Sequence, residues 1–439
     1  MNFIILVNKI ATILFIISFL LFSYRLIFIF YAFKKEKPLK KTNKFAKFAI
    51  LIPARNESKV ITKLFNSIKK QDYNKNLIDV YVITEHINDP TNKIAENFGF
   101  NYFIRKDLKN KRTKGYALNE VVKEIYKRNI KYDAFFIFDA DNILKENFIT
   151  EMNKVYQSGI EVAMAYRNTV NIHDNWVATC SALMFSNTNT FQNKARNYLT
   201  KSIVISGTGY YISSKILDKF KGFPFNSLTE DYEITNYLVV NNIKSKYVTT
   251  TEFYDEQPTD LKTLNNQRVR WCKGYFNNYK KYTNISCKKI LNLKNKNINK
   301  KAILETRLSL LPNLFYIISF IIYSLIQIGI LTYGFFIGNF LISEICFKNL
   351  IKLVFSYYLI IDIYTIMQLI CERKKFKLNL KEIINCLLLN PLFIFMFIFH
   401  AVKAIITKNV SWKVIKHNSN NFNNENLINN KEEFKENYE

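Results

Sequence analysis

The chain has 439 residues, of which 49% are hydrophobic, and it carries a formal net charge of +28. Long apolar runs near both ends exclude an ordinary soluble domain, so we expect an integral membrane protein. Such a positive charge can indicate nucleic-acid binding, but lysines that flank membrane segments explain it better, and no nucleic-acid partner is expected.

The first predicted element is a membrane anchor over residues 10–33, which a lysine-rich linker follows, so that residues 1–44 form an N-terminal anchor and basic linker. No small-residue cleavage site follows the apolar run, which indicates an uncleaved anchor. Lysines also precede the next apolar run. Because such residues gather on the cytoplasmic side of membranes, residues 34–308 are predicted to be cytoplasmic.

Strand and helix patterns alternate through the cytoplasmic domain, which is predicted over residues 45–275. Strands are expected at 48–53, 80–83 and 101–104 and just before Asp139, and helices at 58–70, 91–98 and 115–129. Ser58 is available to cap the first of these helices. This order predicts an α/β fold with a mostly parallel sheet that helices cover on both faces.

The last third of the chain is basic and then apolar. Residues 276–310 are predicted to lie along the membrane surface. A transmembrane region follows over 311–407, with apolar stretches at 311–342, 350–370 and 383–406, and residues 408–439 form a basic and then disordered tail. Because proline breaks a helix, Asn390-Pro391 predicts that 383–406 is bent or re-entrant, which would leave His417 in the cytoplasm.

Two carboxylates, Asp139 and Asp141, follow the apolar strand Phe135-Phe136-Ile137-Phe138. Ligands of open α/β sheets bind beyond the carboxyl ends of the strands. Hard oxygen ligands at that edge suit Mg²⁺ or Mn²⁺ bridging a substrate diphosphate. Taken alone, the pattern is more typical of a solvated turn.

Two polar loops follow the first two predicted strands. Pro53-Ala54-Arg55-Asn56-Glu57 can hold a base and ribose, or form an ordinary strand-to-helix turn in which Asn56 caps the helix. Glu85 can accept a hydrogen bond from a nucleoside, or remain a solvated loop residue.

Two further islands lie downstream. In Thr229-Glu230-Asp231 a carboxylate can act as general base toward a sugar hydroxyl, although Thr229 can also simply cap a helix. The preceding turn Gly207-Thr208-Gly209 would let an acceptor approach the backbone. In Gln267-Arg268-Val269-Arg270-Trp271 the guanidinium groups suit a diphosphate and the indole a sugar ring, and the alternative is a basic helix beside the membrane.

These islands, in this order and at roughly these intervals, resemble the membrane-bound family 2 glycosyltransferases, which include synthases of cellulose, chitin, hyaluronan and poly-N-acetylglucosamine. The resemblance covers about residues 46–275 and implies a GT-A nucleotide-sugar-binding domain. It implies that Asp231 is the catalytic base beside Glu230, and that Gln267, Arg270 and Trp271 meet the diphosphate and acceptor. Asp139 would lie near the UDP, Asp141 would bind the metal, and Lys114 would lie near the nucleotide. Substrate contacts are further expected from Pro53, Arg55, Glu57, Glu85, Gly207, Thr208, Gly209 and Arg268.

One position departs from the family pattern, because Glu85 stands where an aspartate is usual. The resemblance implies an inverting, metal-dependent enzyme in the cell membrane that moves a hexose or N-acetylhexosamine from a UDP-sugar to a growing polysaccharide or lipid-linked acceptor. The alternatives are a non-processive enzyme that forms a glycolipid, and a non-catalytic membrane partner of a glycan assembly complex.

Overall fold

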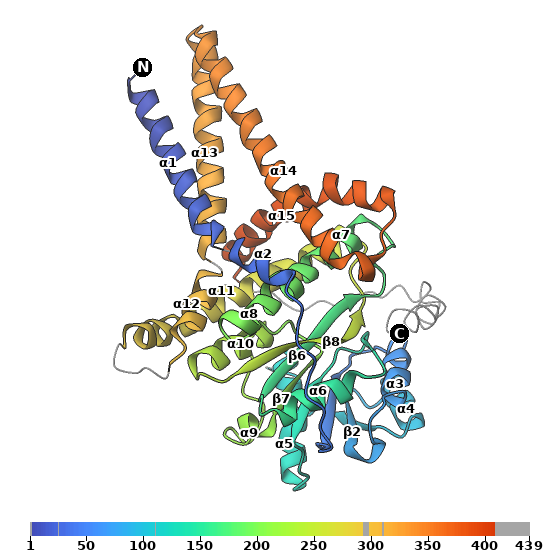
Figure 1. The fold of residues 1–439 in the computed structure, drawn as a ribbon. Helices are drawn as coiled ribbons and strands as arrows, with labels where there is room; N and C mark the ends of the chain where they lie inside the picture. The colour runs from blue at the N-terminus through green and yellow to red at the C-terminus, as the bar shows by residue number, and fades with distance from the viewer. Residues whose placement is uncertain (1, 25, 110, 293–297, 310, 409–439) are drawn as a thin grey trace.

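The computed structural model describes residues 2–24, 26–109, 111–292, 298–309 and 311–408. An α/β domain carries a group of apolar helices that project from it (Figure 1). The predicted tail, with His417, lies outside the described residues.

The α/β domain is built on one eight-stranded sheet in the order β3-β2-β1-β4-β7-β6-β8-β5. Strands β7 and β5 run opposite to the others, so the predicted α/β class with a mostly parallel sheet is confirmed. The strands are β1 (Phe48–Pro53), β2 (Ile78–Thr84), β3 (Asn101–Ile104), β4 (Ala134–Ile137), β5 (Ile143–Leu144), β6 (Val162–Thr169), β7 (Tyr210–Ser213) and β8 (Ser245–Asp255).

The central strands are buried on both faces because alternate side chains enter two separate cores. From β1 and β4, Ile50 and Phe136 join the core beneath α3 and α6, whereas Leu51 and Phe135 join the core beneath α5 and α10. The helices of this domain are α3 (Ile61–Lys69), α4 (Pro90–Asn97), α5 (Lys114–Lys127), α6 (Phe148–Gln157), α7 (Trp176–Ser186), α8 (Lys194–Leu199), α9 (Ser214–Leu217) and α10 (Glu230–Val240), with a π-helical turn over Asn187–Asn193 between α7 and α8.

Three residues that the sequence offered as helix caps do not act as such. Helix α3 begins after Val60, which makes no side-chain cap, so Ser58 does not cap it. Thr229 precedes α10 but its side chain caps no backbone amide of that helix. Asn56 likewise lies in a turn with φ of 58°, and its own amide donates to Asp89 Oδ2 over 3.0 Å.

The apolar helices differ in their bounds from the predicted spans. The first apolar run forms two helices, α1 (Asn2–Ser23) and α2 (Leu26–Ala32), rather than one span over 10–33. Helix α13 (Leu311–Phe336) ends before residue 342, and α14 (Phe340–Phe376) is much longer than 350–370. Helix α15 (Leu380–Ile406) is continuous through Pro391.

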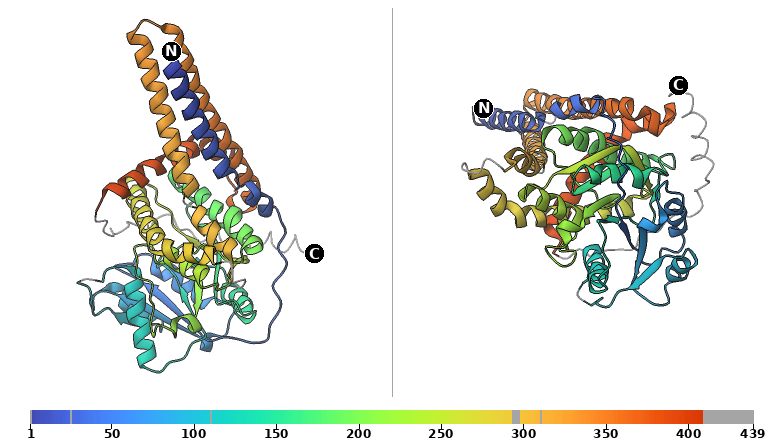
Figure 2. Two further views of the ribbon diagram at one scale, coloured as in Figure 1. Left: turned by 90° about the vertical axis from the view of Figure 1, so that its left-hand side faces the viewer. Right: turned by 60° about the horizontal axis from the view of Figure 1, so that its bottom comes forward.

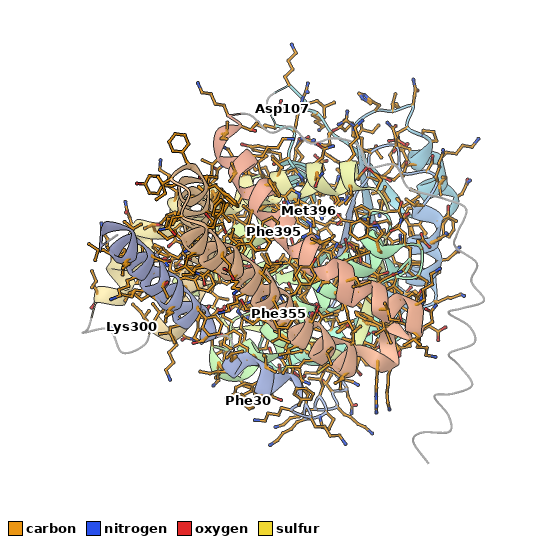
Figure 3. The ribbon with its side chains drawn as sticks, turned by 90° about the horizontal axis from the view of Figure 1, so that it is seen from above. Phe30, Asp107, Lys300, Phe355, Phe395 and Met396 are labelled. Carbon is orange, nitrogen blue, oxygen red and sulfur yellow. The ribbon has the colours of Figure 1, made fainter. Side chains whose placement is uncertain are left out.

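Helices α1, α13 and α14 run alongside one another and away from the sheet, whereas α15 lies across their base (Figures 1 and 2). Seen from above, α15 with Phe395 and Met396 extends across the molecule (Figure 3). It packs on α7 and on α11 (Leu261–Leu291), a helix that passes through residue 275, the predicted end of the domain. Helix α12 (Lys300–Leu308) completes the layer below the bundle. Among the described residues, α13, α14 and α15 contain segments that are long and apolar enough to cross a membrane.

Candidate active site

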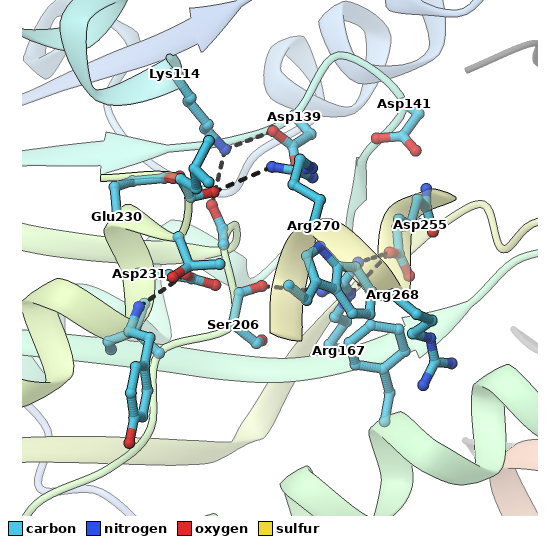
Figure 4. A pocket seen from close by; sticks show the side chains of 18 of the residues that line it. Lys114, Asp139, Asp141, Arg167, Ser206, Glu230, Asp231, Asp255, Arg268 and Arg270 are labelled. Atoms are coloured by element: carbon cyan, nitrogen blue, oxygen red, sulfur yellow. Dashed lines mark hydrogen bonds and ion pairs between the residues drawn. The ribbon is translucent and has the colours of Figure 1, made fainter. Parts of the chain in front are cut away.

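A single cavity of about 720 Å³ lies beyond the carboxyl ends of β1, β2 and β4 and continues toward α7, α11 and α15. Figure 4 shows part of its lining. Most of the residues predicted for the site line it, although they come from distant parts of the chain. They are Pro53, Arg55, Glu57, Glu85, Lys114, Asp139, Asp141, Gly207, Glu230, Asp231, Gln267, Arg268, Arg270 and Trp271.

Two predicted residues, Thr208 and Gly209, support the wall instead of lining the cavity. Thr208 is fully buried, and its hydroxyl oxygen accepts a hydrogen bond from the Asp139 amide over 2.9 Å. Gly209 has a φ of 69°, and a Cβ there would lie 1.9 Å from the Phe253 ring. The expected approach of an acceptor to this backbone is therefore limited to Gly207.

Lys114 joins two edges of the cavity from the first turn of α5. Its Nζ donates to Asp139 Oδ1 over 2.5 Å and to the Gly207 carbonyl over 2.8 Å. Burial lowers the pKa of Lys114, but the carboxylates of Asp139 and Glu230 outweigh burial and the net pKa is raised. A permanently charged ammonium group therefore lies beside Asp139, where it can attract a phosphate.

The loop after β4 holds the second predicted acid. Asn142 is fully buried. Its side-chain Nδ2 donates to Asp141 Oδ1 over 3.1 Å, and its side-chain Oδ1 accepts from the backbone amide of Asp139 over 3.1 Å. Since the side chain of Asn142 is fixed from both sides, the turn between the two carboxylates is preorganised.

Glu85, Arg55 and Arg105 form an ion-pair cluster at the end of the cavity next to β2. Arg55 Nε lies 2.9 Å from Glu85 Oε2, and Arg105 Nη1 lies 3.8 Å from Glu85 Oε1. Arg105 also binds Glu120 of α5 over 3.0 Å. The arginines fix the Glu85 carboxylate, so its extra methylene relative to aspartate is accommodated within this cluster.

Glu230 and Asp231 begin α10, inside the cavity wall. Burial raises the pKa of Glu230 to about 7, with Lys114 opposing and Asp231 adding to the rise, and burial also raises the pKa of Asp231. The Tyr232 amide donates to Asp231 Oδ1 over 2.7 Å and so orients this carboxylate. A buried carboxylate with a raised pKa is a stronger base than a solvated one, as proton abstraction requires.

Helix α11 places the segment from Gln267 to Trp271 against the start of α10, where Glu230 and Asp231 lie. Gln267, Arg270 and Trp271 occupy positions i, i+3 and i+4, which share one helix face. Arg270 Nη1 donates to the Leu228 carbonyl over 3.3 Å. A Cβ on Gly274 would lie 2.4 Å from the Thr229 side chain, so this helix approaches the turn before Glu230 and Asp231 as closely as glycine allows.

An ion pair that the sequence analysis missed crosses the middle of the site. Arg167 Nε donates to Asp255 Oδ2 over 2.8 Å, and its Nη1 donates to the Ser206 carbonyl over 2.9 Å. The guanidinium carbon lies 3.8 Å from the centre of the Phe185 ring. Arg167 and Asp255 lie near the carboxyl ends of β6 and β8. Ligands of such sheets bind at these ends, and this position is the feature by which the two residues could have been predicted.

The donor set of Asp139 and Asp141 suits a hard divalent cation. Among the described residues, no group of three or more His, Cys, Asp or Glu side chains is arranged to hold a metal. Mg²⁺ is commonly held by one or two carboxylates together with substrate phosphates, so two acids are sufficient. Asp141 and Asp139 would hold the ion, which would supply charge neutralisation at a diphosphate.

Comparison with known proteins identifies the class. Residues 46–274 match the family model described as "Glycosyltransferase like family 2", and the chain belongs to that family. A mannosyltransferase from Pyrobaculum calidifontis, solved with GDP-Man and Mn²⁺, has the same fold; it is 14% identical, with a TM-score of 0.55, over 88% of this chain and 98% of that one. The predicted GT-A fold and family are thus confirmed.

Curated relatives match at low identity. A beta-monoglucosyldiacylglycerol synthase of Trichormus variabilis is 23% identical over 55% of this chain and 51% of its own length. Hyaluronan synthase 2 of Xenopus laevis is 24% identical over 34% of this chain and 31% of its own length. The chain spans about half the length of the first of these relatives and less of the second.

Proposed function

We propose that this family 2 glycosyltransferase moves a hexose or N-acetylhexosamine, with inversion, from a UDP-sugar to a growing polysaccharide or a lipid-linked acceptor. One observation carries the proposal: Lys114 beside Asp139, Asp231 and the Gln267–Trp271 segment line a single cavity. Because all these groups are retained together, we disfavour the alternative that the chain is a non-catalytic partner in a glycan assembly complex. Both acceptor types are represented among the relatives, which include a beta-monoglucosyldiacylglycerol synthase and a hyaluronan synthase.

In this proposal the donor lies beyond β1, β2 and β4. The cluster of Arg55, Glu85 and Arg105 holds the nucleoside, and Lys114 and Arg270 bind the diphosphate. Mg²⁺ or Mn²⁺ at Asp139 and Asp141 would stabilise the charge of the leaving UDP. Asp231 takes the proton from the acceptor hydroxyl as that oxygen attacks the sugar carbon.

The enzyme is proposed to be a multi-pass protein of the cell membrane with its catalytic domain in the cytoplasm. The lysines that follow α2 and those on α11 support this orientation, because basic residues remain on the cytoplasmic side.

Membranes containing the protein, incubated with radiolabelled UDP-sugars and Mn²⁺, test the proposal. We expect label to enter a lipid or polymer fraction with at least one donor. If no donor in the panel gave either transfer or UDP binding, the proposal would be contradicted. Product length separates polymer synthesis from single transfer.

A further inference from the structure

Within the described part of the chain, Arg268 is a buried cation without a carboxylate partner, at the end of the cavity that α7, α11 and α15 line. Its residue exposure is 6%, and its Nε and Nη2 have no hydrogen-bond partner among the described residues. Its Nη1 contacts the sulfur of Met184, and its guanidinium lies 5.3 Å from the Trp271 ring centre and 5.1 Å from that of Phe393. An unpaired charge in such surroundings is unfavourable, and aromatic contacts offset its lost hydration only in part.

The other buried arginines around the cavity are satisfied by carboxylates. Arg167 pairs with Asp255, Arg196 with Glu305, and Arg105 with Glu120. The guanidinium of Arg268 is different, because burial lowers its pKa to about 10 without a carboxylate to oppose the effect. The site therefore has a charge ready for an anion that none of the described residues supplies.

The position of Arg268 indicates where that anion comes from. In Figure 4 it lies at the opposite end of the drawn side chains from Lys114 and Asp139, where the donor diphosphate is proposed. The neighbouring wall is apolar and is formed by α7, α11 and α15, with Met184, Phe185, Trp271 and Phe397 lining the cavity. Since α15 is apolar enough to enter a membrane, a lipid can reach this end while a nucleotide occupies the other.

Resting on the proposed function, we infer that the acceptor is an anionic lipid whose headgroup carries both a phosphate, bound by Arg268, and a hydroxyl, presented to Asp231. In the transfer, a bond forms between the hydroxyl oxygen and the anomeric carbon of the sugar. The bond from that carbon to the UDP oxygen breaks, and its electron pair leaves with UDP. The hydroxyl proton passes to Asp231. The lipid phosphate is unchanged and serves only in recognition.

A matched pair of acceptors tests this inference: phosphatidylglycerol and diacylglycerol with the same acyl chains, presented in neutral vesicles to the full-length enzyme. A third arm uses a polyprenyl diphosphate that bears a sugar, which separates a phospholipid from a lipid-linked glycan as the source of the phosphate. We expect transfer to at least one phosphate-bearing acceptor and a much lower rate with diacylglycerol. Arg268→Gln should raise the acceptor KM by about 10- to 100-fold and leave the UDP dissociation constant unchanged.

Two further variants separate recognition from folding. Arg268→Lys keeps the charge but loses the planar fork, so it should recover part of the acceptor affinity. Arg307→Gln is the matched control. Arg307 is also buried and its Nη1 donates to the Tyr279 carbonyl, but Arg307 does not line the cavity. It should not change the ratio of rates between the two acceptors.

Equal use of diacylglycerol, with a ratio that Arg268→Gln leaves unchanged, would overturn the inference while the proposed function stands. Loss of UDP binding in Arg268→Gln, with an unchanged acceptor KM, would also overturn it and place Arg268 at the donor. Absence of transfer and of UDP binding in the wild-type enzyme would instead reject the proposed function.

Discussion

At the scale of single residues, Asp231 is the group on which the proposed chemistry depends most. Asp231→Asn removes the base but keeps the size of the side chain, so transfer should fall by roughly 10²-fold or more while UDP binding survives. Rates and UDP titrations on the purified variant check this. Asp218→Asn, at an exposed position bonded to Tyr126, is the control and should behave as wild type. A folded Asp231→Asn enzyme with normal turnover would remove Asp231 from this role.

The acid limb of the pH profile should report the buried pair Glu230 and Asp231. Both pKa values are raised, that of Glu230 to about 7, so lowering the pH protonates these carboxylates sooner than solvated ones. Transfer should therefore decline as the pH falls through about 7. Glu230→Gln removes the neighbouring negative charge, which should move the remaining acid limb to lower pH. A profile that is flat across neutral and mildly acidic pH would contradict this assignment.

The proposed metal dependence rests on Asp139 and Asp141. Chelation should abolish transfer, and Mg²⁺ or Mn²⁺ should restore it, because two carboxylates and a diphosphate repel one another without a cation. Asp141→Ala should weaken UDP binding in the presence of metal and have less effect without it, as calorimetry can measure. Full activity after EDTA treatment would reject the metal.

Strand ends and short motifs predicted most of the residues that line the cavity, but not the pair of Arg167 and Asp255. Their partnership depends on how β6 lies beside β8, and the register between these strands shifts between Ala165 and Tyr166. Because these strands are far apart in the sequence and their pairing is irregular, the periodicity of the sequence does not reveal how they pair. Likewise, Thr208 was expected at the acceptor, because a sequence pattern does not show which side of a turn faces solvent.

At the scale of elements, the bounds of two strands were predicted better than the helix ends. The bounds of β1 and β3 agree with the prediction, because turn-forming residues mark where each of these two short strands ends. The start of α3 was misplaced, since several residues before it could cap and only tertiary contacts select the first turn. The reversed strand β7 was not foreseen, because its direction depends on pairing with β4 and β6.

The close approach of α11 to the catalytic turn gives a prediction about Gly274. A methyl group at Gly274 would press on the β-branched side chain of Thr229, at 2.4 Å, and displace Glu230 and Asp231. Gly274→Ala should reduce turnover by up to about 10²-fold, since small displacements of reacting groups have such effects. In Gly329→Ala, on α13, the new methyl meets nothing within 4 Å, and turnover should be unchanged. Equal turnover of the two variants in steady-state assays would contradict the steric argument.

At the scale of the whole molecule, polar contacts attach the membrane helices to the catalytic domain. Tyr166 of β6 donates its hydroxyl to Glu372 Oε2 over 2.8 Å, and Lys375 pairs with Glu252 of β8. The C-terminal end of α14 is therefore on the side of the sheet, and the turn between α13 and α14 is at the far end of the bundle (Figure 2). If the bundle spans the membrane, this turn and the catalytic domain are on opposite sides.

The orientation of α15 distinguishes a full crossing from an element that stays on one side. It lies across the base of the bundle and packs on α7 and α11. The Asn390 side chain, beside Pro391, donates to Thr365 Oγ1 over 2.8 Å, so this polar group has its partner within the protein. We therefore expect Lys408 to lie on the same side as the catalytic domain. With an impermeant thiol reagent, Phe336→Cys should be labelled in intact cells, and Lys408→Cys only after permeabilisation, as should the exposed native Cys287. Labelling of Lys408→Cys in intact cells, with Cys287 still protected, would show that α15 crosses the membrane completely.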